Sequence, residues 1–156
     1  MKEMDGFAVG PAEREVIRNP VGGDLTFLVR REQSNGTLLA VETVAPPGEG
    51  PPLHTHTLEE ETIYVVSGAF RFQVGDEVRD APAGSFAFVP RGVAHTWQNI
   101  GDAAGKLLVT FVPAGMEGFF ERLSRMREFD PAEFRAAAAE QGTEVVGPPL
   151  AVSHPL

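Results

Sequence analysis

The feature that most constrains the fold is a series of short β-forming segments separated by residues that favour turns. Between Leu25 and Val112, runs rich in β-branched and aromatic side chains alternate with Gly, Pro, Asn or Asp. Many short strands with this punctuation predict an all-β sandwich or barrel. The segments are residues 25–30, 37–44, 62–66, 70–74, 85–89 and 106–112. The expected turns contain Gly or Asn, which adopt positive φ, and they are residues 34–36, 67–68, 75–76 and 83–84.

Length and charge narrow the class of protein. A chain of 156 residues with 42% hydrophobic and 22% charged residues suits one globular domain. It contains no cysteine, which excludes disulfides and thiolate metal sites. A formal net charge of −9 disfavours binding to nucleic acid or to an anionic membrane. No secretory signal and no apolar run of ~18 residues is apparent, so we expect a cytoplasmic protein that does not cross a membrane.

Two helices are expected after Pro113. The first carries one apolar stripe at helical spacing, which we expect to pack as core on the outside of the barrel or near its mouth. The stripe comprises Met116, Phe119, Phe120, Leu123 and Met126. The second begins at the N-cap Asp130, with Glu133 closing a capping box and Phe129 and Phe134 forming a hydrophobic staple, and ends near Gly142. Residues 145–156 are expected to be extended, with His154 at the surface.

Histidines at alternate positions point to a metal site. On an extended chain, residues i and i+2 face the same side, so His54 and His56 can present two imidazole nitrogens to one point. Two histidines on a strand are by themselves weak evidence, and further ligands must come from neighbouring strands. The surrounding sequences are G-E-G-P-P-L-H-T-H-T-L-E-E-E-T-I-Y-V-V-S-G, from Gly48 to Gly68, and G-S-F-A-F-V-P-R-G-V-A-H-T-W-Q-N, from Gly84 to Asn99.

These two stretches resemble the paired motifs of the cupin superfamily, G-x5-H-x-H-x3/4-E-x6-G and G-x5-P-x-G-x2-H-x3-N. The resemblance implies a double-stranded β-helix (jelly-roll) barrel over residues 1–113, with the motif core at 48–99 and a C-terminal helical extension over 114–156 packed on the barrel. It also implies the metal ligands His54, His56, Glu61 and His95. Glu60 is the alternative carboxylate, because the motif tolerates three or four residues after the second histidine.

The expected cofactor is one divalent transition metal ion per chain. Imidazole nitrogen and carboxylate oxygen, without sulfur, suit Fe, Ni, Mn, Co, Cu or Zn and do not select among them. Four protein ligands leave one or two octahedral positions for water, substrate or dioxygen, as in a catalytic site. A purely structural metal is the alternative.

Strand alternation suggests which side chains line a substrate pocket. Ile63 and Val65 share the face of Glu61, and Trp97 shares the face of His95. Phe72 and Phe88 would add aromatic walls if their faces turn inward; aromatic filling of the barrel core is the alternative. Asn99 is expected to fix a turn by bonding to backbone rather than to contact the metal.

Three functions fit this site. The resemblance extends to single-domain, quercetinase-like dioxygenases, which implies oxidation or cleavage of a small aromatic or enolisable substrate with dioxygen. Glu61 is then the candidate catalytic residue, accepting the substrate proton. The alternatives are a non-redox lyase, isomerase, cyclase or decarboxylase that uses the metal as a Lewis acid, and a non-catalytic small-molecule binder. A homodimer formed through the sheets is expected.

Overall fold

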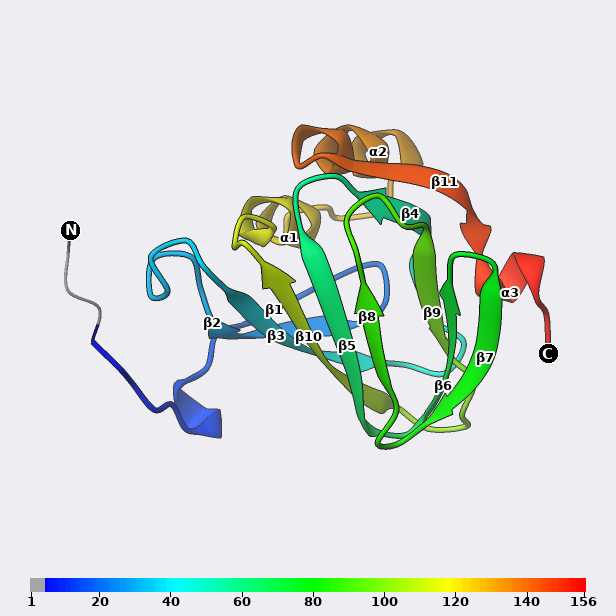
Figure 1. The fold of residues 1–156 in the computed structure, drawn as a ribbon, viewed down its shortest axis with the longest axis horizontal. Helices are drawn as coiled ribbons and strands as arrows, with labels where there is room; N and C mark the ends of the chain where they lie inside the picture. Colours follow the sequence, from blue (N-terminus) through cyan, green and yellow to red (C-terminus); the bar gives the residue numbers. More distant parts are fainter. Residues whose placement is uncertain (1–4) are drawn as a thin grey trace.

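The computed structural model describes residues 5–156, which form two antiparallel β-sheets with helices at one end (Figure 1). The six-stranded sheet has the order β1-β2-β3-β10-β5-β8, and the five-stranded sheet has the order β11-β4-β9-β6-β7. This confirms the predicted all-β architecture with C-terminal helices. The first sheet contains β1 (Val16–Ile17), β2 (Asp24–Val29), β3 (Leu39–Ala45), β10 (Gly105–Val112), β5 (Glu60–Ser67) and β8 (Phe86–Val89). The second contains β11 (Thr143–Pro149), β4 (Pro52–His56), β9 (His95–Asn99), β6 (Ala69–Val74) and β7 (Glu77–Pro82), and a short 3-10 helix, η1 (Pro11–Glu13), precedes β1.

The core lies between the two sheets because side chains alternate along their strands. In β10, the buried Leu107, Val109 and Phe111 alternate with side chains that retain more solvent contact. In β5 the buried residues are Glu61, Ile63 and Val65. A period of two with one apolar face is what a strand covered on one side requires.

The expected turns form where glycine was predicted to allow them. Gly68, Gly75 and Gly84 all have positive φ, at 91°, 59° and 92°. At Gly68 a Cβ atom would also lie 2.8 Å from the Cα atom of Gly105. A larger residue at position 68 would therefore meet both backbone strain and a clash where β5 turns into β6.

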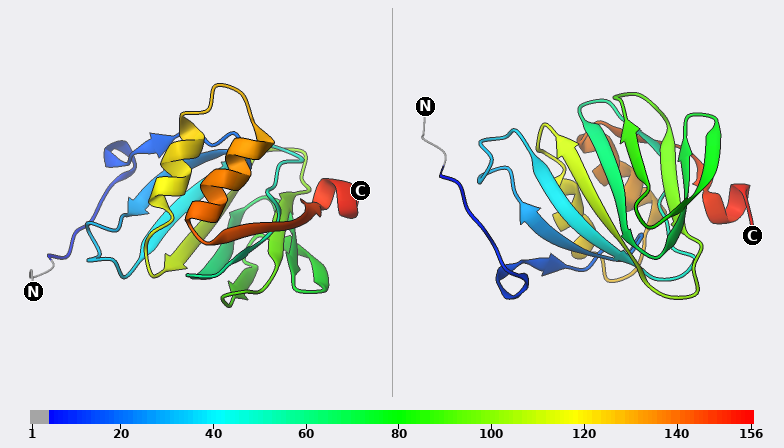
Figure 2. Two further views of the ribbon diagram at one scale, coloured as in Figure 1. Left: turned by 90° about the horizontal axis from the view of Figure 1, so that it is seen from above. Right: turned by 60° about the horizontal axis from the view of Figure 1, so that its bottom comes forward.

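Helices α1 (Glu117–Ser124) and α2 (Pro131–Glu140) lie side by side across one end of the two sheets (Figures 1 and 2). Asp130 caps α2 by accepting hydrogen bonds from the backbone N–H groups of Ala132 and Glu133, and the rings of Phe129 and Phe134 are 5.7 Å apart. The predicted cap and staple are thus confirmed. The capping box is not formed, because the Glu133 carboxylate accepts a hydrogen bond from Arg122 instead.

The end of the chain differs from the expected extended tail. Residues Thr143–Pro149 form β11, which pairs with β4, and a short helix, α3 (Leu150–Ser153), follows. β11 runs beside α2 in both views of the helices (Figures 1 and 2). The segment after residue 113 thus contributes a strand to the second sheet as well as helices, and the division into a barrel and an extension stays a prediction.

The outer face of the six-stranded sheet carries exposed aromatic side chains. Tyr64 on β5 lies opposite Phe86 on the edge strand β8, and both are exposed, as is Phe88. The homodimer stays a prediction. Within residues 5–156, no helix is long and apolar enough to span a membrane.

Candidate metal centre

Strand register brings the three predicted histidine ligands together. His54 on β4 pairs directly with His95 on the neighbouring strand β9. His56 lies two residues after His54, on the same face of β4. Glu61 comes from β5 in the opposite sheet. The four residues therefore meet between the sheets, as the sequence predicted.

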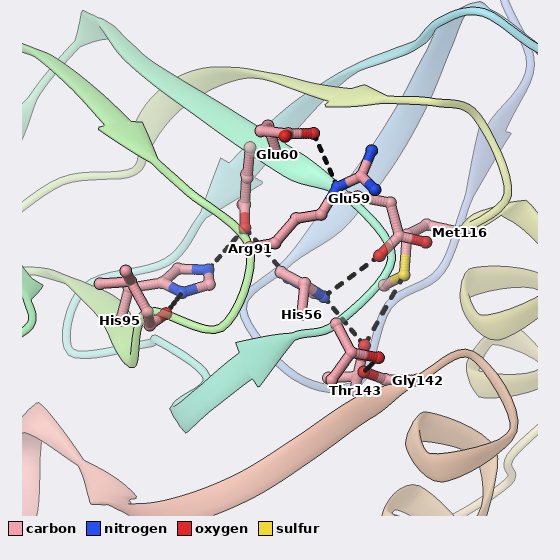
Figure 3. Close-up of polar contacts among 11 residues, drawn as sticks. His56, Glu59, Glu60, Arg91, His95, Met116, Gly142 and Thr143 are labelled. Atoms are coloured by element: carbon pink, nitrogen blue, oxygen red, sulfur yellow. Dashed lines mark hydrogen bonds and ion pairs between the residues drawn. The ribbon is translucent and has the colours of Figure 1, made fainter.

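Their ligand atoms converge on a small region. One atom from each of the four residues lies within 4.8 Å of the other three. The Glu61 Oε2 atom is 3.0 Å from His56 Nε2 and 2.6 Å from His95 Nε2. Glu60, the alternative carboxylate, instead forms an ion pair with Arg91 at 3.0 Å (Figure 3). The structure therefore places Glu61, and not Glu60, with the histidines.

The outward ring nitrogens fix how the histidines are protonated. His54 Nδ1 lies 2.7 Å from the Pro52 carbonyl oxygen, and His95 Nδ1 lies 3.0 Å from that of Val93. A carbonyl oxygen can only accept, so each Nδ1 carries a proton and donates it. The Nε2 atoms are left as the potential ligands, which is how hydrogen bonds outside a metal site orient its histidines.

His56 is oriented by a residue that sequence reasoning missed. Its Nδ1 lies 2.9 Å from the hydroxyl of Thr143, and that hydroxyl in turn donates to the Met116 sulfur at 3.8 Å. In Figure 3, dashed lines join His56 to Glu59 and to Thr143, and join Thr143 to the Met116 sulfur. Thr143 lies directly across from His56 in the β11–β4 pairing. Only the pairing of β11 reveals this contact, so no local sequence signal pointed to it.

Replacing Thr143 by valine should weaken metal binding by ~10–100-fold, the usual cost of removing a hydrogen bond that orients a metal-bound histidine. Valine keeps the branched shape but leaves His56 Nδ1–H without its acceptor. Serine keeps the hydroxyl, so Thr143→Ser is the matched control. Competition titration against a chelator of known affinity measures the change. Wild-type affinity in the valine variant would show that Thr143 does not orient His56.

Charge interactions inside the cluster shift its ionisation in the metal-free protein. Burial alone would raise the pKa of Glu61, but the neighbouring His95 and His56 outweigh it and hold that pKa well below its usual value. Burial opposes protonation of His95, yet Glu61 raises the His95 pKa overall. Burial and the two other histidines lower the pKa of His54 to about 3. In the metal-free site these shifts favour an ion pair between His95 and Glu61 beside a neutral His54.

A second buried carboxylate lies next to the cluster. Glu59 Oε2 is 3.9 Å from His56 Nδ1 and has no hydrogen-bond partner. Its burial raises its pKa. The motif spacing singled out Glu60 and Glu61 and gave no reason to expect Glu59 inside the protein.

The donor set fits a divalent metal ion. The buried His56 Nε2 has no hydrogen-bond partner, although it lies close to Glu61 Oε2. A buried nitrogen without a hydrogen-bond partner lowers the stability of the fold unless a ligand binds it. Three imidazole nitrogens and one carboxylate oxygen are the ligands that borderline transition metals accept.

The cluster opens onto a partly enclosed cavity of about 70 Å³. His54, His56 and Glu61 form its polar end, and Trp97 lines it as predicted. The described lining residues include neither lysine nor arginine. The remaining walls come largely from the sheets and the two helices, and include Val41, Val109, Phe111, Met116, Phe119 and Leu123.

Four predicted pocket residues lie elsewhere. Phe88 is 55% exposed on the outer face of β8, so the prediction that it lines the pocket is wrong. Ile63, Val65 and Phe72 do face inward, but they pack in the hydrophobic core and are not part of the cavity wall. Asn99 is fully buried and bonds to the backbone of Ala45, Ala103 and Gly101, which confirms its predicted structural role.

The apolar stripe of the first helix lies closer to the site than expected. Met116, Phe119, Phe120 and Leu123 all line the cavity as well as packing against the sheets. The expectation that this stripe serves only as core packing is therefore incomplete. Spacing identified the buried side of the helix, but it could not show that this side closes the end of the barrel where the histidines lie.

Comparison with known proteins gives consistent matches. Residues 41–111 match the family model described as a cupin domain. Protein SchB of Streptomyces halstedii is 31% identical over 94 residues, which cover 59% of this chain and 67% of that protein. An oxalate-binding protein of Thermotoga maritima is 31% identical over 121 residues, covering 72% of this chain and 98% of that protein.

A solved structure shares the arrangement of the sheets. It is described as a predicted oxalate decarboxylase from Thermotoga maritima, and it superposes with a TM-score of 0.60 at 24% identity. The match covers 69% of this chain and 99% of the other. At this identity the likeness concerns the fold, and it confirms the expected jelly-roll.

Proposed function

This chain belongs to the cupin family, and from that premise we propose that it is an enzyme whose substrate binds through an oxygen atom to a metal ion held by the three histidines and Glu61. One observation carries the proposal: the buried ligand cluster opens directly onto a partly enclosed cavity. A purely structural metal site is closed by its protein ligands, whereas a catalytic one keeps a position for substrate.

The cavity favours a substrate of low charge. Apart from the ligand cluster, its described walls are mainly aliphatic and aromatic and contain no lysine or arginine. A divalent metal ion beside the Glu61 carboxylate would leave one net positive charge, which balances a singly ionised group and not a dianion. Burying an unpaired charge is costly, so a neutral or singly ionised group suits these walls better. A phenol, enol or β-diketone carries one acidic oxygen on an otherwise apolar body and meets this requirement.

The reaction we propose first is a dioxygenase reaction of the quercetinase-like type. When bound, the metal would supply Lewis-acid activation of the substrate oxygen and a place for dioxygen. Glu61 is the one carboxylate among the described residues of the cavity wall, so it is the group placed to take the hydroxyl proton of the substrate. Trp97 and Phe111 would pack against the apolar body of the substrate and exclude water.

Non-redox decarboxylation is the second candidate. It is supported by what the relatives from Thermotoga maritima are said to be, an oxalate-binding protein and a predicted oxalate decarboxylase. The absence of lysine and arginine from the described cavity wall weighs against oxalate itself. A non-catalytic binder is the third candidate, and the open cavity beside the ligand cluster supports it less than an enzyme.

The test begins with elemental analysis of protein purified without added metal. Samples reconstituted with Fe, Ni, Mn or Co are then assayed for dioxygen uptake with catechols and β-diketones, and for carbon dioxide release from oxalate. We expect one metal ion per chain and substrate-dependent uptake. Release of carbon dioxide from oxalate without dioxygen uptake would favour the second candidate, non-redox decarboxylation. Failure to bind metal under every reconstitution would overturn the proposal.

A further inference from the structure

A second and larger hollow adjoins the metal cavity. It is a surface groove of about 700 Å³ between α2, β11 and residues 49–52. Val21 and Phe134 form part of its wall and also part of the wall of the metal cavity. The two spaces are therefore neighbours that share these two side chains as a common wall.

Phe134 links the two spaces through its aromatic neighbours. Its ring is 5.7 Å from that of Phe129, which lines the outer groove, and 5.6 Å from that of Phe119, which lines the metal cavity. Phe134 is carried by α2, and the described ion pairs joining α2 to α1 run from Arg122 to Glu133 and Glu140. These pairs lie near the surface, where such contacts contribute little to holding a helix in place.

The two volumes suit different parts of one molecule. A water molecule needs about 10–15 Å³ of cavity volume, so the metal cavity holds about five to seven non-hydrogen atoms. The outer groove is ten times larger. Its wall is formed mostly by proline, valine and phenylalanine, with Glu49 and Arg135 as its charged members.

We propose that the substrate has a small oxygen-bearing head that occupies the metal cavity and a longer apolar tail that lies in the outer groove. The head and tail are joined past Val21 and Phe134. This inference rests on the proposed function and deepens it, because it names the substrate class: a slender, amphiphilic molecule and not a compact dianion. Binding of the tail would then set the affinity, while the head sets the chemistry.

Alkyl hydroxamic acids of two lengths test this proposal on the cobalt-loaded protein. Acetohydroxamic acid has a metal-binding head of a size that the inner cavity admits, and octanohydroxamic acid adds six methylene groups. Each buried methylene contributes about 0.8 kcal/mol, a gain of roughly fourfold each. Allowing for partial burial, we expect the longer compound to bind at least ~30-fold more tightly, measured by calorimetry.

A matched pair of variants locates the tail. Val146 on β11 lines the outer groove and is 46% exposed, whereas Val66 on β5 is 44% exposed on the opposite sheet. Val146→Asp should reduce the affinity for octanohydroxamic acid at least ~5-fold by placing a charge beside the tail. It should leave acetohydroxamic acid unaffected, and Val66→Asp should change neither affinity.

The outcomes separate this inference from the proposed function. Tight binding of acetohydroxamic acid with no gain from the longer chain would overturn the inference and leave the proposed function standing. An equal loss in the Val146→Asp and Val66→Asp variants would also overturn it, because the tail would then not lie in the groove. Absence of acetohydroxamic acid binding to the cobalt-loaded protein would overturn the open metal site, and the inference with it.

Discussion

Replacing His95 by alanine should lower the affinity for cobalt or zinc by more than ~100-fold, since loss of a direct ligand costs more than loss of a residue that only orients one. His95 is almost completely buried, and its Nε2 contacts Glu61, so solvent offers no adequate substitute for the missing nitrogen. Chelator competition on the refolded or native variant measures the affinity, and elemental analysis measures the metal content after purification.

The chain supplies its own control for that substitution. His154 is the one histidine outside the cluster, and it is exposed at the C-terminal end of α3. His154→Ala should therefore retain wild-type metal affinity. A His95→Ala protein that is folded by circular dichroism and still binds metal as tightly as the wild type would remove His95 from the ligand set.

Acidification should destabilise the metal-free protein through His54. The pKa of His54 is lowered to about 3 in the folded protein by burial and by the neighbouring His95 and His56. Between that value and about 6.5, the unfolded chain binds a proton at His54 that the folded protein does not. The free energy of unfolding therefore falls as the pH falls through this window, by at most about 1.4 kcal/mol per pH unit. Because His54 keeps partial solvent exposure, we expect a total of ~3 kcal/mol.

Urea unfolding of metal-free protein between pH 4 and 6 measures this slope. His54→Gln should flatten it, because glutamine takes up no proton. His95→Gln tests a contribution to the free energy of unfolding that has the opposite pH dependence. The His95 pKa is raised by Glu61, so its contribution is fully present below about pH 6.5 and is lost as the pH rises through the raised pKa. If the free energy of unfolding of the His54→Gln protein falls with pH as steeply as that of the wild type, His54 is not held neutral.

The cluster of candidate metal ligands could be predicted from the sequence because its geometry is partly local. His54 and His56 lie at i and i+2 on a strand, and that spacing alone puts both rings on one face. The motif resemblance placed Glu61 and His95 beside them, and strand pairing then brought the four residues together as expected. The hydrogen bonds of Asn99 were predicted for a similarly local reason, since its partner Gly101 lies two residues away.

The pocket residues were predicted less well because alternation fixes only the face of a strand. Ile63 and Val65 share the inward face with Glu61, but they lie further along β5 and fill the core beyond the cavity. For Phe88 the pattern left both faces open, and the pairing of β8 with β5 turns it outward. Depth within a barrel depends on how strands tilt and pack, which a single strand sequence does not contain.

The strand β11 escaped prediction because its sequence argues against a strand. It contains Gly147, Pro148 and Pro149, residues that are disfavoured inside sheets. It is tolerated as an edge strand whose one partner among residues 5–156 is β4, with an irregular register between Val145 and Pro149. The missed strand is also the reason that Thr143 was missed.

Because His56 and Thr143 are far apart in the sequence, the site cannot be completed until long after His56 has been synthesised. The two residues are 87 positions apart, and the ribosome adds ~5–20 residues per second, so Thr143 follows His56 by ~4–17 s. A nascent chain that has already paired β4 with β9 can gather three imidazoles and a carboxylate, but nothing yet holds the ring of His56. A metal ion bound at that moment would meet a ligand set in which His56 is not yet oriented, because its hydrogen bond to Thr143 forms only after Thr143 has been synthesised.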